Sequence, residues 1–445
     1  MNNLKKDFKN FENENTENIE NKSGKRLPET FIFLYVLLVA AYFFSYFFRV
    51  SSSVVMPILA SEWGMNASLV GFISSLYFYM YAFMQPISGA LNDKFGPTYV
   101  VSAGIFVTGI GALLFGFAPN PLVLSIGRLL TGLGLAPMLS GVLVYQANRF
   151  PKNKYAFFSG ITYTVGNFGA VISVAPLAFA ISSFGRNMVF VFLAVINVVL
   201  AVLIFSRRKN DPILSHRKKK ANVDSTPLIK QMGFAIKKIF KTKQLIFMLI
   251  LWGISFGSLM SLQGLWAVSW YQTSYGISSN EASSWATLIG IGVMLGNFFG
   301  AHIAKDSKNR KKVIAIACSV YSVSWLVLLF GIYSHVPIIV VGILGCILGL
   351  AAGVSYVHLT AGVNDISPAG KNGALFGMMN FFVFVCVIVF QWGTGVILQN
   401  FPGLTEGVYT HEGYMVTFTV VTVLALLSLF ALLFIRSFSD FKGDE

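Results

Sequence analysis

The chain has 445 residues, of which 55% are hydrophobic and 11% are charged. Soluble globular proteins carry about a quarter charged residues, so this composition excludes an ordinary soluble domain and indicates a polytopic membrane protein. The formal net charge of +15 does not indicate nucleic-acid binding, because the basic residues lie in loops and no basic folded domain is present.

The first 28 residues are polar and contain no apolar core of a signal peptide, so we expect a disordered tail there. Apolar stretches long enough to cross a bilayer, which takes roughly 20 residues, follow in succession. Twelve spans are predicted: 30–60, 68–91, 98–118, 121–147, 155–181, 187–206, 244–271, 281–304, 312–332, 336–361, 371–398 and 412–436.

The longest predicted loop divides these spans into two sets of six. We therefore expect five regions: a cytosolic tail (1–28), an N-terminal six-helix bundle (29–206), a basic cytosolic linker (207–243), a C-terminal six-helix bundle (244–436) and a second tail (437–445). The run from Arg217 to Lys220 in the linker is interpreted as a solvated determinant of topology, with a regulatory lipid site as the alternative. The linker is expected to lack regular structure.

Lysine and arginine are distributed very unequally between the two sides of the predicted membrane. The tails and loops of one side hold 30 of the 33, whereas the other side holds only Arg186. Positive charge accumulates on the cytoplasmic side, so both termini are predicted to lie in the cytosol, with the chain in the cell membrane.

A short motif recurs at the same place in both halves. Gly89-Ala-Leu-Asn-Asp93-Lys94-Phe-Gly96 closes the second span, and Gly300-Ala-His-Ile-Ala304-Lys305 closes the eighth. The first segment resembles the Gly-x-x-x-Asp-(Arg/Lys)-x-Gly loop of the major facilitator superfamily. Further pieces resemble that family in order along the chain: Arg128-Leu-Leu-Thr-Gly132-Leu-Gly134, Gly166-Asn-Phe-Gly169 and Phe184-Gly185-Arg186.

The resemblance implies an all-α fold of twelve transmembrane helices in two pseudo-symmetric six-helix bundles, working by alternating access. It also implies a gating role for Gly89, Asp93, Lys94 and Gly96. Asp93 is expected to cap a neighbouring helix or to pair with a cation in one conformation. The second copy has alanine at position 304 in place of the aspartate, so the gating contact is expected mainly in the first half.

Charge inside a bilayer is costly and usually marks function, and Arg49 is the residue that lies deepest in a span. It shares a helical face with Tyr42, Ser45, Tyr46 and Ser53, and this face is predicted to line the substrate path. A guanidinium suits a carboxylate or phosphate, so Arg49 is the leading anion-binding candidate. A structural arginine is the alternative, and for Arg128 the structural or gating role and the substrate role stay open.

Other polar and aromatic side chains within spans are candidates for the same cavity. They are Tyr145, Gln146, Tyr163, Asn167, Gln263, Trp266 and Asn380, with Tyr77, Tyr81, Trp270, Asn297 and Gln391 as a wider set. All 18 acidic residues fall in tails, loops or span ends, which argues against a cationic substrate. His358 is a possible proton-coupling group, although a packed histidine is the alternative.

These observations favour a secondary transporter of a small organic anion, such as a monocarboxylate. An amino-acid or dipeptide transporter of the same fold is the alternative, and a transporter-like receptor is a third. No catalytic set, metal cluster or phosphate loop is visible, and Cys318, Cys346 and Cys386 lie in apolar stretches, so we expect no enzyme activity, cofactor or metal. The expected partners are an anionic substrate, the bilayer and a coupled proton or sodium ion, with no nucleic acid, for a monomer.

Overall fold

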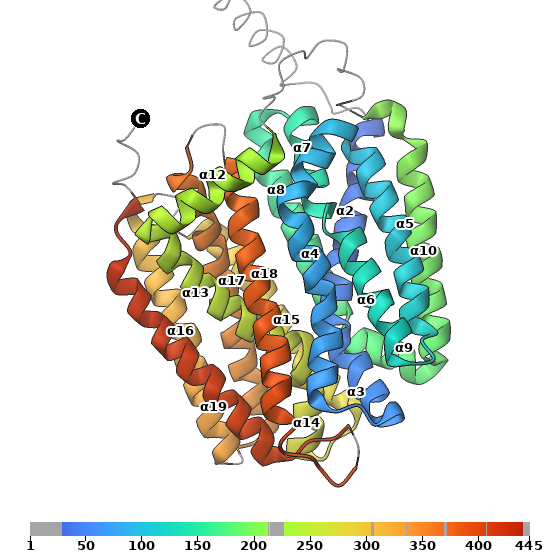
Figure 1. The fold of residues 1–445 in the computed structure, drawn as a ribbon, viewed down its shortest axis with the longest axis vertical. Coiled ribbons are helices and arrows are strands. Elements are labelled where there is room, and N and C mark those ends of the chain that lie inside the picture. Colours follow the sequence, from blue (N-terminus) through green and yellow to red (C-terminus); the bar gives the residue numbers. More distant parts are fainter. Residues whose placement is uncertain are drawn as a thin grey trace, which may run out of the picture.

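The computed structural model describes residues 29–211, 213, 227–303, 307–334, 336–368, 372–405 and 407–438. The first bundle, blue to green in Figure 1, is built from nine helices. These are α2 (Glu29–Val50), α3 (Ser52–Trp63), α4 (Ala67–Phe95), α5 (Pro97–Gly116), α6 (Pro121–Leu135), α7 (Met138–Arg149), α8 (Lys152–Ile172), α9 (Ala175–Phe184) and α10 (Arg186–Ser206). The predicted tail at 1–28 lies outside the described residues.

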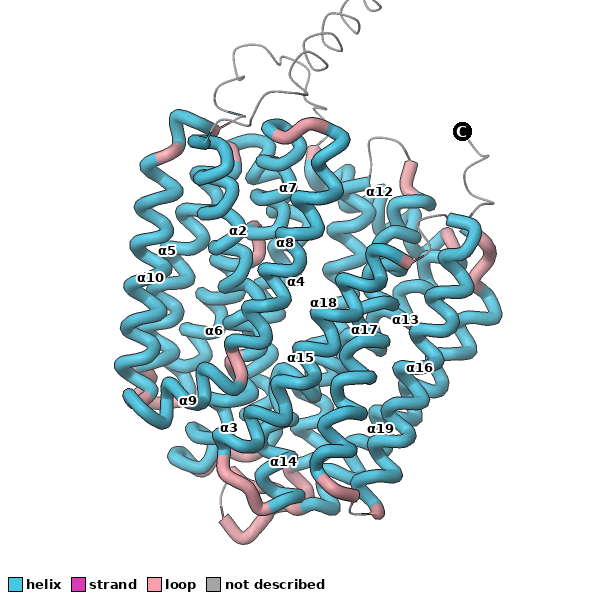
Figure 2. The backbone as a smooth tube through the Cα atoms, turned by 180° about the vertical axis from the view of Figure 1, so that it is seen from behind, coloured by secondary structure: helices cyan, strands magenta, loops and turns pink. Residues whose placement is uncertain are grey.

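The second bundle stands beside the first and continues in the colour series to red (Figure 1). It comprises α13 (Lys243–Ser261), the π-helical turn η2 (Leu262–Trp266), α14 (Ala267–Tyr275), α15 (Ser279–His302), α16 (Ser307–Tyr333), α17 (Ile338–Ile366), α18 (Asn372–Leu398), α19 (His411–Ser428) and the 3₁₀ turn η3 (Leu429–Phe434). Every element drawn in Figure 2 for the described residues is a helix or a loop.

The prediction of twelve spans in an all-α fold is confirmed. Among the described residues, eleven continuous stretches are long and apolar enough to cross a membrane, and α8 with α9, bent by 44°, gives a twelfth when the pair is counted as one span. The chain enters α2 and leaves η3 on the same side of the molecule (Figure 1). We call this the terminal side, and the other the opposite side.

Several spans predicted as single helices are interrupted. The first span breaks at Ser51, where the Ser51 hydroxyl donates to the carbonyl of Phe48 at 3.2 Å. Short polar side chains that bond to nearby backbone in this way loosen a helix. The fourth span breaks before Pro137, and the fifth breaks before Pro176, because proline cannot donate the helical hydrogen bond.

The linker also differs from the prediction. Residues 228–241 form a regular helix, α12 (Leu228–Lys241), which lies obliquely across the terminal side of the second bundle (Figure 1). The expectation of an unstructured linker was therefore wrong at this segment. Its apolar residues repeat at helical spacing, and the density of lysines obscured that repeat. The run from Arg217 to Lys220 lies outside the described residues.

The two bundles are joined by hydrogen bonds close to the opposite side. The Asn280 side chain donates to the Ser182 hydroxyl at 3.0 Å, and the backbone N–H of Ala175 donates to the Thr287 hydroxyl at 3.1 Å. In addition, the Tyr409 hydroxyl donates to the carbonyl of Met65 at 3.2 Å. These bonds hold the two halves together on the opposite side.

Candidate functional site

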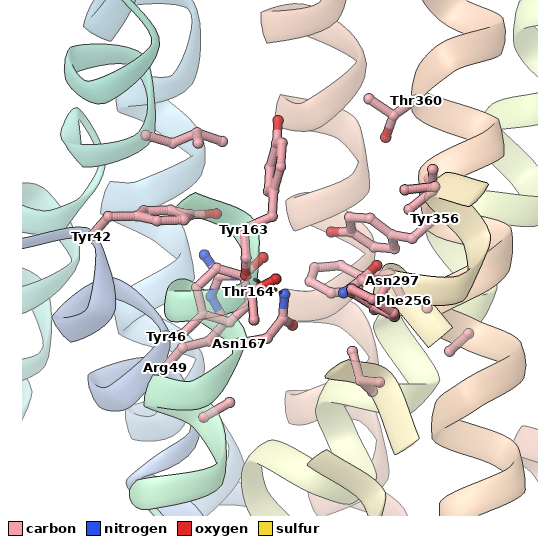
Figure 3. A pocket seen from close by; sticks show the side chains of 18 of the residues that line it. Tyr42, Tyr46, Arg49, Tyr163, Thr164, Asn167, Phe256, Asn297, Tyr356 and Thr360 are labelled. Carbon is pink, nitrogen blue, oxygen red and sulfur yellow. Dashed lines mark hydrogen bonds between the residues drawn. The ribbon is translucent and has the colours of Figure 1, made fainter. Parts of the chain in front are cut away.

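A cavity of about 870 Å³ lies between the two bundles. The first bundle contributes walls mainly from α2 and α8, and the second from α13, α15, α17 and α18. Both halves thus supply side chains to one cavity (Figure 3), which is the placement expected of a site that changes when the halves move.

The mouth of the cavity is on the terminal side. Its exposed lining residues gather near the start of α8 and the end of α15, where Phe157 is 66% exposed and Phe298 is 52% exposed. His302, the last residue of α15, lies at the same rim. Because the bonds between the bundles close the opposite side, the structure represents a state open toward the terminal side.

Arg49 lies in the wall of this cavity and is 3% exposed. Its guanidinium carbon stands 4.4 Å from the ring centroid of Tyr46, 5.0 Å from that of Tyr81 and 5.5 Å from that of Phe384. Such cation–π contacts stabilise a desolvated cation. Among the residues that the structure describes, Arg49 has no hydrogen-bond acceptor and no ion-pair partner, and its Nε is buried without an acceptor.

Few acidic or basic side chains accompany Arg49 in the lining. In the described part of the chain, no aspartate, glutamate or lysine lines the cavity, and His302 at the rim is the other basic side chain. The Arg49 charge is therefore balanced only by aromatic faces and dipoles. A buried arginine without a counter-ion is costly, so an anion that enters the cavity would relieve that cost.

Seven of the predicted substrate-binding residues reach the cavity or border it. They are Tyr42, Tyr46, Arg49, Tyr163, Asn167, Gln263 and Asn380, joined by Tyr81 and Asn297 of the wider set. In Figure 3, Tyr42, Tyr46, Arg49 and Asn167 approach from the first bundle, and Asn297 faces them from the second. The Asn380 side chain is also within 3.4 Å of the Gln85 carbonyl oxygen Oε1, across the bundle interface.

Four predicted substrate-binding residues do not line the cavity, because their polar atoms are engaged elsewhere. Ser45 pairs with the Tyr77 hydroxyl, and the Tyr145 hydroxyl donates to the carbonyl of Phe31 at 3.0 Å. The Gln146 amide donates to the Thr162 hydroxyl at 2.6 Å, and the Trp266 indole donates to the Thr394 hydroxyl at 2.9 Å. Each of these bonds joins neighbouring helices of one bundle.

Arg128 has a different environment from Arg49. It is 1% exposed and lies outside the cavity, where its two terminal nitrogens donate to the carbonyls of Phe48 and Ser74, both at 2.8 Å. These bonds tie α6 to α2 and α4. Of the two roles left open for Arg128, this geometry supports the structural one. His358 is also buried, on α17, and does not line the cavity.

Most of the cavity residues from the second bundle were not predicted from the sequence. Trp252, Phe256, Tyr356, Thr360 and Phe384 all line the cavity. Helical spacing contained a signal for Phe384, which lies one turn beyond Asn380. The others are Thr360 and ordinary aromatic residues, and only tertiary packing distinguishes them from lipid-facing residues.

The motif at residues 89–96 forms the corner between α4 and α5 on the terminal side. Gly96 adopts a φ of +85°, which favours glycine, while Asp93 and Lys94 are exposed at the end of α4. The carboxylate that caps α5 is Asp211, which accepts from the Thr98 backbone N–H at 2.9 Å and from the Thr98 hydroxyl. Asp211, just after α10, was not predicted for this role.

A gating role for Gly89, Asp93, Lys94 and Gly96 stays a prediction. The structure shows one state of the carrier, whereas gating is a difference between two. In the second copy of the motif, Gly300 lies in α15, and Ala304 and Lys305 are outside the described residues.

Comparison with known proteins places this geometry in a family. Residues 38–391 match the family model of the Major Facilitator Superfamily. The hexuronate transporter of Bacillus subtilis is 24% identical over 404 residues, covering 85% of this chain and 90% of that protein. A probable sulfoacetate transporter of Cupriavidus necator is 29% identical over 174 residues, covering 38% of this chain and 40% of that protein.

Solved structures agree at the level of the fold. The D-xylose-proton symporter superposes with a TM-score of 0.71 at 13% sequence identity, covering 92% of this chain and 99% of that chain. The family model spans most of the chain, and the observed architecture is that of the superposed transporter. The chain is therefore a secondary transporter of the Major Facilitator Superfamily.

Proposed function

We propose that this transporter carries a small organic anion with one carboxylate or comparable acidic group. The observation that carries the proposal is Arg49, a desolvated guanidinium in the cavity wall with no partner among the described residues. Its planar fork can donate two parallel hydrogen bonds to a carboxylate. Hydrogen bonds to charged groups contribute about 1.5–3 kcal/mol each, enough to select an anion from neutral solutes.

The other lining residues indicate the chemistry of the part of the substrate that carries the acidic group. Asn167, Gln263, Asn297 and Asn380 supply amides, and Tyr163 and Tyr356 supply hydroxyls, so an uncharged polar body would find donors and acceptors. A second carboxylate would find no second arginine or lysine among the described lining residues. The hexuronate transporter named above is a relative whose substrate bears one carboxylate on a polar body, which supports this class.

Alternating access follows from the same geometry. The cavity is open toward the terminal side, and the two halves are bonded together on the opposite side. If the halves separated on the opposite side and closed on the terminal side, the cavity would open to the other face of the membrane and release the substrate there. The lysine and arginine distribution supports a cytosolic terminal side in a cell membrane. With that orientation, the described state is inward-open. A coupled proton or sodium ion is compatible with this scheme.

An amino acid or short peptide is the second candidate. The aromatic rings of Trp252, Phe256 and Tyr356 lie in the wall contributed by the second bundle, and aromatic faces attract an ammonium group. A zwitterion would then place its carboxylate on Arg49. The two candidates differ in whether a positive group is needed on the substrate.

Uptake into proteoliposomes tests the proposal. Radiolabelled monocarboxylates, sugar acids and dipeptides are offered to the wild type, to Arg49→Ala and to Arg186→Ala. Arg186 is the matched control, because its arginine lies on the opposite side, 3.8 Å from Glu62 and outside the cavity. We expect Arg49→Ala to lose uptake about 100-fold or more, since truncating one partner of a buried charge pair costs about 3–5 kcal/mol.

Uptake of an acid that survives in Arg49→Ala at the wild-type rate would contradict the proposed role. Uptake of dipeptides in preference to simple acids would favour the second candidate. Counterflow of labelled substrate in the same liposomes would exclude a receptor that only senses its ligand.

A further inference from the structure

The linker helix α12 has three separate faces. Ile229, Ile236 and Phe240 are seven and four residues apart and form one stripe along the helix. A second stripe is formed by the lysine that directly follows each of these residues, namely Lys230, Lys237 and Lys241. Ala235 and Ile239 form a third.

The third face attaches α12 to the protein. Ala235 and Ile239 are both 0% exposed, and the helix packs against α18 and α13, with contacts also to α4 of the first bundle. The Phe240 ring meets the Phe382 ring of α18 edge to face, at 5.6 Å between centroids. These contacts fix the rotation of α12 about its own axis, so the orientation of the other two stripes is determined.

The first stripe is apolar and exposed, although its Phe240 ring also contacts Phe382 of α18. Ile229 is 83% exposed, Ile236 is 39% exposed and Phe240 is 57% exposed. Beside it, Lys230, Lys237 and Lys241 are exposed, and no acidic residue occurs anywhere between positions 227 and 243. An apolar stripe bordered by lysines is the pattern of a helix that lies in the plane of a membrane surface.

The chain connection sets the depth of α12. Only Thr242 separates the end of α12 from Lys243, where α13 begins its passage across the membrane. The last turn of α12 must therefore lie at the boundary between hydrocarbon and headgroups. α12 runs obliquely across the terminal side there and not away from it (Figure 1).

We propose that α12 is an interfacial helix that binds the anionic lipid leaflet on the terminal side. Ile229, Ile236 and Phe240 enter the boundary of the acyl chains, and Lys230, Lys237 and Lys241 bind lipid phosphates. A soluble protein partner does not fit as well, because the apolar stripe lies at the depth of the lipid. The lipid contact holds α12 against α18, so anionic lipid stabilises the folded carrier.

Spin labels report the depth directly. Cysteine is introduced as Ile236→Cys or Lys237→Cys, in full-length protein whose three native cysteines are replaced by serine, reconstituted in phosphatidylglycerol-containing vesicles. We expect the label at 236 to be relaxed mainly by oxygen and the label at 237 mainly by a water-soluble nickel chelate. Equal access of the nickel chelate to both labels, or exclusion of both reagents from them, would overturn the proposal.

A lipid titration tests whether the three lysines of α12 bind anionic lipid. It uses protein that retains its native cysteines. Thermal unfolding is followed as phosphatidylglycerol replaces phosphatidylcholine, for the wild type, for the Lys230→Gln/Lys237→Gln/Lys241→Gln variant and for a control. The control, Lys154→Gln/Lys209→Gln/Lys312→Gln, removes three exposed lysines from other positions on the terminal side. Each lysine near an anionic surface strengthens attraction by about fivefold.

We therefore expect wild type and control to be stabilised by phosphatidylglycerol at similar mole fractions. The α12 variant should need at least about tenfold more lipid for half the effect, or show none. Inorganic phosphate added in detergent should not replace the lipid, because it has no acyl chains for the apolar stripe. The proposal fails if the α12 variant responds as the wild type does, or if the control loses the response equally.

Discussion

Arg49 and Arg128 are both buried in the first bundle, but different groups compensate for the loss of water around each guanidinium. Arg128 donates to two backbone carbonyls of neighbouring helices at 2.8 Å. Arg49 faces the cavity, where aromatic rings surround it and none of the described residues accepts a hydrogen bond from it. The Nε of each arginine is buried without an acceptor, so the difference lies in the terminal nitrogens. Terminal nitrogens bonded to the backbone support the fold, whereas those left without an acceptor next to a cavity are available to a ligand.

The largest effect on stability is expected at Arg128. Replacement by methionine keeps much of the volume but removes the donors to the carbonyls of Phe48 and Ser74. We expect Arg128→Met to destabilise the carrier by about 2–4 kcal/mol, because two buried hydrogen bonds from a charged donor to backbone carbonyls are lost. Unfolding in detergent measures this. Arg49→Met is the matched control and should lose little or no stability; an equal loss in both variants would remove the distinction.

The next largest effect is expected when the planar guanidinium at position 49 is replaced by an ammonium group. Arg49→Lys keeps the positive charge but cannot form the paired hydrogen bonds of a guanidinium with a carboxylate. We expect KM for the transported acid to rise about tenfold, equivalent to about 1.4 kcal/mol. Transport assays over a range of substrate concentrations measure it. An unchanged KM would mean that Arg49 acts only as a point charge.

A smaller effect is expected at the far wall of the cavity. Tyr356 lines it from the second bundle, and Tyr356→Phe removes one hydroxyl without changing the ring. We expect a three- to tenfold loss of affinity for a substrate with a polar body, since a neutral hydrogen bond contributes about 1 kcal/mol. Simple acids without hydroxyl groups should be unaffected. A loss that is the same for both kinds of acid would place the hydroxyl outside the substrate contact.

The smallest effect is expected at His358. Its ring is buried in α17 but does not line the cavity, unlike Tyr356 two residues earlier. We expect His358→Gln to leave KM for the acid within about twofold, which is near the scatter of such assays and below 0.5 kcal/mol. The pH profile of uptake is the second readout. A profile that shifts by a full pH unit would restore His358 as the proton-coupling group.

The membrane spans, and the residues that share a face of one helix, were predictable from the sequence. The interruptions within helices, and the face of each helix that meets the cavity, were not. The predicted span 187–206 corresponds to α10 (Arg186–Ser206), because length and hydropathy alone define a span. The interruptions at Ser51 and at the π-helical turn depend on local hydrogen bonds and packing. The helix in the linker could have been found from the spacing of Ile229, Ile236 and Phe240.

The candidate site shows the same limit. Tyr42 and Tyr46 were predicted with Arg49 because residues three and four apart share a face, and all three line the cavity. Tyr145 and Gln146 are equally polar members of a span, but their helix turns these side chains toward neighbours within the first bundle. Which face of a helix meets the cavity is a tertiary property that one sequence does not reveal.

Ligand-induced stabilisation of the Arg49 variant shows whether Arg49 binds the transported acid. An acid that the wild type transports should raise the midpoint of thermal unfolding of the wild type, because ligands stabilise the state that they bind. We expect Arg49→Ala without ligand to unfold at or above the wild-type midpoint and to show no rise with the acid. An Arg49→Ala protein that is folded and is stabilised by the acid as much as the wild type would contradict it.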